Sequence, residues 1–136
     1  MKIRRLSNSE ELSLPNDLLW TDEFDWSPLV SATSFSLGGA LFVEQGLKLA
    51  GRPFTLRSAQ PDMAWITRAA GIKLLQWGAL PNETFRLILE YPTDARTFDV
   101  IFDTTGAPMA LVPVKEYPAH EDNDVFLVTV LKLIGV

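Results

Sequence analysis

The sequence predicts a mainly β (α+β) fold, a β-sandwich or split barrel with one flanking α-helix. Only residues 61–79 place apolar side chains at helical spacing over a helical length. Most of the chain beyond residue 28 consists of short strand-like runs separated by turns rich in glycine and proline. An amphipathic helix in a β domain must bury its apolar side, so we expect the sheet to receive it.

The expected helix has recognisable ends. Pro61 suits a first-turn position, Asp62 complements the helix N-terminus, and Gly78 ends the helix. Gly71 lies in the middle, where glycine costs roughly 1 kcal/mol relative to alanine, and it either permits close packing or splits the helix. The side chains expected to face the sheet are Ile66, Ala70, Leu74 and Trp77.

The first 27 residues differ from the rest and are interpreted as an N-terminal arm or extension, with residues 28–136 as a single β-sandwich domain. Six acidic residues without a basic one follow the basic start, and apolar side chains are interspersed among them. The segment is either pinned to its own domain by its aromatics or lies on a neighbouring subunit. The interface candidates here are Leu19, Trp20, Phe24 and Trp26.

Residues 29–58 are expected to form two or three strands. Gly38 and Gly39 permit a bulge or bend, after which residues 40–44 continue as a strand. Gln45-Gly46 and residues 51–53 are read as turns.

Four more strands are expected after the helix, over residues 84–90, 97–103, 108–115 and 125–133. Both faces of the last strand are apolar, which predicts a central or an interface position. Leu127 and Leu131 are therefore further interface candidates.

Composition limits the possible functions. The chain of 136 residues has no cysteine, which excludes disulfides, thiolate zinc sites and thiol catalysis. No apolar run approaches the roughly 20 residues that cross a bilayer, and no secretory signal is expected. The net charge of −5 disfavours specific nucleic-acid binding, although like charge would let DNA pass without sticking.

No motif indicates catalysis, a metal or a cofactor, so we expect a protein that is not an enzyme. Residues 120–124 offer oxygen and nitrogen ligands for a cation, but they lack EF-hand spacing and are read as a solvated loop. Asp22, Glu23 and Asp25 are not expected to lie in a cleft. The serines at 31, 34 and 36 precede the single histidine without a nucleophile motif. Trp65 and Trp77 are read as core residues rather than pocket walls.

Several stretches together resemble a family of tail structural proteins from tailed bacteriophages, which share the tail-tube fold. These stretches are residues 18–23 with Trp26, 39–41, 51–56, 65–68 and 124–133. The order of strands, one helix and hairpins is also similar to that fold, which tube subunits share with the distal tail protein that joins tube and baseplate. The accessory domain of many distal tail proteins is missing here.

The resemblance implies a non-enzymatic virion protein of a long-tailed phage, made in the host cytoplasm. It would form a homo-oligomeric ring around the DNA channel, at the tail tip or in the tail tube, without a cofactor. Its other partners would be tail proteins such as the tube, hub and tape measure. The alternative is a small carbohydrate- or ligand-binding β-sandwich, in which Trp20, Trp26 or Trp65 stacks on a sugar.

Overall fold

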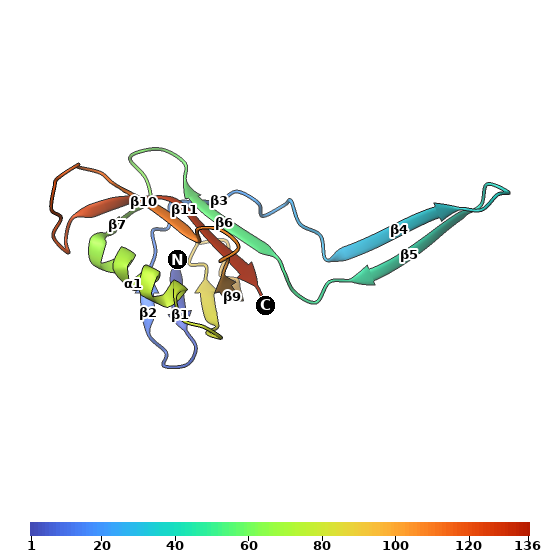
Figure 1. Cartoon of the computed structure of the whole chain (residues 1–136), viewed down its shortest axis with the longest axis horizontal. Coiled ribbons are helices and arrows are strands. Elements are labelled where there is room, and N and C mark those ends of the chain that lie inside the picture. The colour runs from blue at the N-terminus through green and yellow to red at the C-terminus, as the bar shows by residue number, and fades with distance from the viewer.

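The computed structural model describes residues 1–136 and has the predicted fold class: it is mainly β, with antiparallel sheets and one flanking helix (Figure 1). The elements are β1 Lys2–Arg5, β2 Glu11–Ser13, β3 Leu18–Trp20, β4 Leu29–Phe35, β5 Leu41–Leu47, β6 Pro53–Ser58, β7 Trp65–Thr67, α1 Arg68–Gly78, β8 Phe85–Ile88, β9 Thr97–Phe102, β10 Met109–Pro113 and β11 Val125–Gly135. The helix is too short to cross a membrane.

Strand β11 organises the main sheet. The nine-stranded sheet runs β2-β1-β8-β9-β11-β6-β3, and β7 and β10 also pair with β11. Along one edge β11 pairs with β10 and then β9, and along the other with β7 and then β6. The central position predicted for this strand is therefore confirmed, and its two apolar faces follow from it.

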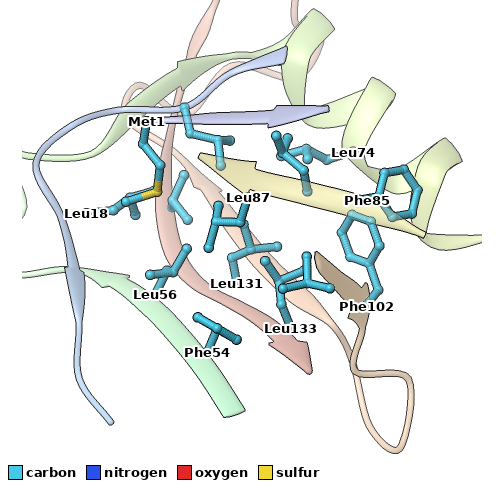
Figure 2. Packing of buried hydrophobic residues seen from close by; sticks show 14 of the residues in the cluster. Met1, Leu18, Phe54, Leu56, Leu74, Phe85, Leu87, Phe102, Leu131 and Leu133 are labelled. Atoms are coloured by element: carbon cyan, nitrogen blue, oxygen red, sulfur yellow. The ribbon is translucent and has the colours of Figure 1, made fainter. Parts of the chain in front are cut away.

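Most of the core lies between strands of the curved main sheet, and α1 adds Leu74 and Trp77 to it from one side (Figure 2). Eighteen buried hydrophobic residues form one cluster, and none of the buried residues is polar or charged. The largest fully buried side chains are Phe54, Phe85, Ile3, Leu56, Leu74, Leu87, Leu89, Leu131, Leu133, Val100 and Val128. They come from both ends of the chain, so the core forms only when distant segments meet.

The structure corrects the expected N-terminal arm over residues 1–27. Strand β1 pairs with both β2 and β8, and β3 pairs with β6, so residues 1–20 belong to the main sheet. Met1, Ile3, Leu14 and Leu18 are buried in the core. The physical reason is the apolar side chains between the charged residues, which complete the core from this side of the sheet.

The structure also shortens the predicted helix from residues 61–79 to Arg68–Gly78. Residues 65–67 form β7 instead, because they pair with Val125–Leu127 of β11. Thr67 is the N-cap, and its hydroxyl accepts a hydrogen bond from the backbone N–H of Ala70 at 3.3 Å. Leu74 and Trp77 face the core as predicted, whereas Ile66 reaches the core from the strand.

The largest difference from expectation concerns residues 29–47. Gly38 and Gly39 are neither a bulge nor a bend but the tip of a hairpin, in which β4 and β5 pair over their full length. Gly39 has a φ of +85°, which glycine adopts without steric cost. Gln45 and Gly46 lie inside β5 rather than in a turn. Figure 1 shows this β4–β5 hairpin extending away from the body.

Candidate functional site

The β4–β5 hairpin is the most distinctive surface of the protein. Its two strands form a separate sheet, and every residue of both strands is exposed. A two-stranded hairpin is marginally stable in water, because it lacks a covering layer for its apolar side chains. A hairpin of this length and composition is therefore expected to pack against another surface.

The register of the hairpin gathers five large apolar side chains on one face, with Ser31, Thr33 and Gln45 between them. Directly opposed residues project from the same face, as Leu29 and Leu47 do near the body and Phe35 and Leu41 near the tip. This surface is called the apolar hairpin face, and its large side chains are Leu29, Phe35, Leu41, Val43 and Leu47. Phe35 is 73% exposed, so the chain itself provides no cover for it.

The opposite face of the hairpin carries fewer large apolar side chains. It presents Val30 and Phe42 among small residues, together with Glu44. Glu44 is the single ionisable residue between positions 29 and 47. The asymmetry between the faces indicates which of them packs against a partner.

Polar contacts fix the root of the hairpin, which comprises residues 20–28 and 48–55. The Asp22 carboxylate accepts hydrogen bonds from the backbone N–H and the hydroxyl of Thr55, at 2.9 and 2.8 Å. Arg96 donates to the Glu23 carboxylate at 2.9 Å, and Arg52 donates to the Glu23 carbonyl at 3.1 Å. The segment before β4 is thus attached to β6 and to the residues that precede β9.

Arg96 also pairs with Asp94, and this contact shifts the pKa of both side chains. Hydrogen bonds from Arg96 hold the pKa of Asp94 below its ordinary value. The hydrogen bonds to Asp94 and then to Glu23 raise the pKa of Arg96. Arg96 therefore bridges two carboxylates, one before β4 and one before β9.

Aromatic rings complete the hairpin root. The Trp20 ring stacks on Phe54 with centroids 4.8 Å apart, and the Arg52 guanidinium lies 4.8 Å from the Trp20 centroid. The same guanidinium lies 5.5 Å from the ring of Phe98 and 5.8 Å from that of Trp26. Cation–π contacts of this kind are worth about 0.5–2 kcal/mol each. Trp20 and Trp26 are consequently half-buried at the hairpin root, and Trp26 also lines an open pocket with Arg52 and Phe98.

The structure separates the predicted interface residues of the N-terminal segment. Phe24 is 93% exposed, and Leu19 is 44% exposed at the edge strand β3. Trp20 and Trp26 are half-buried in the hairpin root. Phe24 and Leu19 thus stay available to a partner, while the two tryptophans hold the hairpin.

The two candidates from the last strand have different environments. Leu127 is half-buried and lies between Trp65 of β7 and Val112 of β10. Leu131 is only 1% exposed, so its prediction as an interface residue is wrong. It lies where β11 is paired on both edges, opposite Met109 and Leu56, and its side chain belongs to the core.

The polar clusters considered in the sequence do not form a composite site. Ser31 and Ser34 lie on the exposed hairpin, whereas His120 lies in the loop between β10 and β11, at the other end of the molecule (Figure 1). His120 approaches the Asp124 carboxylate at 3.4 Å and the ring of Phe126 at 5.1 Å. No group of three or more histidine, aspartate or glutamate side chains is arranged to hold a metal ion.

The remaining tryptophans lie in different surroundings. Trp77 is buried and stacks on Phe85 with centroids 5.3 Å apart, which confirms its prediction as a core residue. Trp65 is 44% exposed in β7, and its indole N–H donates to the Pro61 carbonyl at 3.0 Å. The expected core position is therefore wrong for Trp65.

Sequence reasoning placed strands in the hairpin but did not identify its exposed face as a candidate site. The one usable signal was the near absence of charge between residues 29 and 47. A scan against models of protein families, a search of curated proteins and a search of solved structures each found no match.

Proposed function

We propose that this chain is a non-enzymatic structural subunit that assembles with copies of itself through the β4–β5 hairpin. More specifically, we propose that the chain is a virion protein of a long-tailed phage and forms a ring at the tail tip or in the tail tube. The observation that carries the assembly role is the extended hairpin with an uncovered apolar face. The phage assignment rests on the resemblance in sequence and order of elements.

The energetics of the hairpin favour assembly over isolation. Complete burial of a large apolar side chain is worth about 1.5–3 kcal/mol, and the apolar hairpin face offers five such side chains. Association must also overcome lost translational and rotational freedom, which costs several kcal/mol. A hairpin held rigidly at its root loses less freedom on docking than a flexible loop, so more of the burial energy favours association.

The charge of the chain suits a ring around a DNA channel. A net charge of −5 gives a surface that repels passing phosphates wherever acidic groups face the channel. The proposed partners are further copies of this chain and other tail proteins such as the tube, hub and tape measure.

The assembly role is tested by removing the hairpin without disturbing the body. The backbone N–H of Lys48 donates to the carbonyl of Pro28 at 2.7 Å, so the two ends of the hairpin are already adjacent. Replacement of residues 29–47 with an Asn-Gly turn is expected to give a folded monomer by native mass spectrometry. The full chain is expected to form a discrete oligomer, seen as a ring with a central channel by electron microscopy. A full chain that stays monomeric at assembly-permissive concentration would contradict the proposal.

A further inference from the structure

A pocket of about 370 Å³ opens at the hairpin root, where the hairpin leaves the body beside the end of β11 (Figure 1). Trp26 and Leu49 line it from the root, Phe98 lines it from β9, and Arg52 lies among them. We call it the root pocket. Small-molecule sites measure roughly 300–1,000 Å³, so the volume suits a small organic ligand rather than a single ion.

Arg52 gives the root pocket a positive charge that the chain does not neutralise. Its guanidinium donates one hydrogen bond, from Nη2 to the Glu23 carbonyl at 3.1 Å, and forms no ion pair with a carboxylate. Its Nε is buried and has no acceptor in the chain. Buried donors are almost always paired, and a guanidinium carries several N–H donors in a planar fork that matches a carboxylate. Arg52 therefore lacks the acceptor that its donors require.

The other charged side chains of the root pocket already have partners. Arg86 and Asp99 line the pocket and pair with each other, with Nε and Oδ1 2.9 Å apart. The remaining lining side chains are uncharged, so none of them offers a counter-charge to Arg52. Lys48 adds a further cation nearby, with its Nζ 5.7 Å from the centre of the Trp26 ring. The pocket therefore favours an anionic ligand, although the chain as a whole is acidic.

Aromatic rings beside Arg52 give the root pocket a surface for a ring-shaped ligand. The Arg52 guanidinium lies 5.8 Å from the centre of the Trp26 ring and 5.5 Å from that of Phe98, so the cation and the rings adjoin. Trp26 is only half-buried, which leaves part of its ring to a ligand. Small-molecule sites combine such apolar surfaces with a few polar groups that fix orientation, and the Arg86–Asp99 pair supplies polar groups here. This combination suits a sugar ring that carries hydroxyls.

We propose that the root pocket binds a carboxylate-bearing sugar of the uronic acid type. The carboxylate accepts hydrogen bonds from the Arg52 guanidinium, and the sugar ring packs on Trp26. The inference does not depend on the assembly role proposed above, because no residue of β4 or β5 lines the pocket.

Titration calorimetry of the unmodified chain tests the class of ligand. Glucuronate carries both the sugar ring and the carboxylate, glucose carries the ring alone, and acetate carries the carboxylate alone. Glucuronate is expected to bind about tenfold more tightly than glucose or more, because glucose cannot form the charge-assisted hydrogen bonds to Arg52. Acetate is also expected to bind more weakly, because it has no ring to pack on Trp26. Failure of glucuronate to bind at millimolar concentration, or equal binding by glucose or acetate, would overturn the proposal.

Nuclear magnetic resonance and two matched variants locate the ligand. In the unmodified chain the Nε–H signal of Arg52 is expected to shift on addition of glucuronate, while that of Arg57, which is exposed and outside the pocket lining, stays unchanged. Trp26→Ala is expected to weaken glucuronate binding severalfold. Trp65→Ala is its control, because Trp65 is an exposed tryptophan beside the other end of β11, and it should leave binding unchanged. An unshifted Arg52 signal, or equal binding by the two tryptophan variants, would place the ligand outside the root pocket and overturn the proposal.

Discussion

A Cβ atom added to Gly71 of α1 would lie 2.7 Å from Cδ1 of Leu111 in β10. Real Cβ atoms essentially never approach another atom so closely, so a side chain at position 71 would displace the Leu111 side chain. The sequence left open whether Gly71 permits close packing or splits the helix. Because α1 is continuous from Arg68 to Gly78, Gly71 does not split the helix, and it packs closely against Leu111. Both residues also line an apolar pocket between α1 and the strands β10 and β11.

Gly71→Ala is expected to change the stability of the fold only slightly. The added methyl must displace the Leu111 side chain. Removal of a mid-helix glycine favours the helix by about 1 kcal/mol, and the displaced leucine offsets a similar amount. Chemical denaturation should therefore show a change in unfolding free energy within about 1 kcal/mol.

The control for this substitution is Gly78→Ala in the last helical turn. A Cβ there would meet Phe102 at an ordinary 3.7 Å, so the substitution should be neutral or slightly stabilising. A Gly71→Ala variant that is stabilised by the full amount of about 1 kcal/mol would mean that Leu111 yields to the added methyl at no cost.

Leu131→Ala is expected to destabilise the fold severely, in contrast to Leu19→Ala. Leu131 is buried at the centre of the sheet, and loss of a buried leucine side chain costs about 2–5 kcal/mol. Leu19 lies on an exposed edge strand, where truncation usually changes stability by about 0.5 kcal/mol or less. Urea denaturation of the two variants measures the difference. Similar losses at both positions would argue against the core position of Leu131.

Arg52→Ala is expected to loosen the hairpin root while the body stays folded. The substitution removes the contacts with Trp20 and Phe98 and the hydrogen bond to Glu23, for a combined loss of about 1–3 kcal/mol. Arg52→Lys should recover less than half of this loss, because an ammonium lacks the planar surface that stacks on the rings. Hydrogen exchange over residues 48–52 reports the loosening directly.

Arg57→Ala is the matched control, because Arg57 is an exposed arginine of β6, the strand that begins directly after Arg52, and contacts only a neighbouring carbonyl. If the two alanine variants exchange and unfold alike, the aromatic cluster does not hold the root.

The Asp94–Arg96 pair predicts a loss of stability in acid. The pKa of Asp94 is lowered in the folded state, chiefly by hydrogen bonds from Arg96. Ionised Asp94 therefore stabilises the folded state fully above pH 3.8, the ordinary pKa of an aspartate. This stabilisation is lost as the pH falls through the lowered pKa of Asp94 in the folded state. The stabilities of the unmodified chain and of Asp94→Asn should differ near neutral pH and converge as the pH falls through the lowered pKa of the folded state. Thermal unfolding between pH 2 and 7 checks this, and parallel curves throughout would speak against the pairing.

The strand content could be predicted because it depends on local patterns. The alternation of apolar and polar residues predicted the ends of β8 to β11 to within two residues. The two apolar faces of β11 indicated its central position in the sheet. The start of α1 could not be located, because residues 65–67 fit a helical pattern and are diverted by pairing with β11, about 60 residues away. Local periodicity does not record a partner at that distance.

The candidate site was harder to predict than the fold. An alternating strand indicates that a face is covered, but it does not say whether the same chain covers it. For β4 and β5 the nearly uncharged sequence is that of a buried hairpin, yet Phe35, Leu41 and Val43 are exposed in the isolated chain. For the N-terminal segment the error was the reverse: its many acidic residues suggested an exposed arm. Its apolar side chains, such as Ile3 and Leu18, are instead buried and complete the core.

Hydrogen exchange across residues 29–47 of the assembled full chain tests the central claim most directly. If the apolar hairpin face is buried between copies, amides in β4 and β5 should exchange many-fold more slowly in the oligomer than in the Phe35→Asp variant, whose charge on this face is expected to keep it monomeric. The decrease should centre on the residues around Phe35 and Leu41. Exchange at the same rate in both samples would show that the hairpin stays exposed in the assembly and would contradict the account.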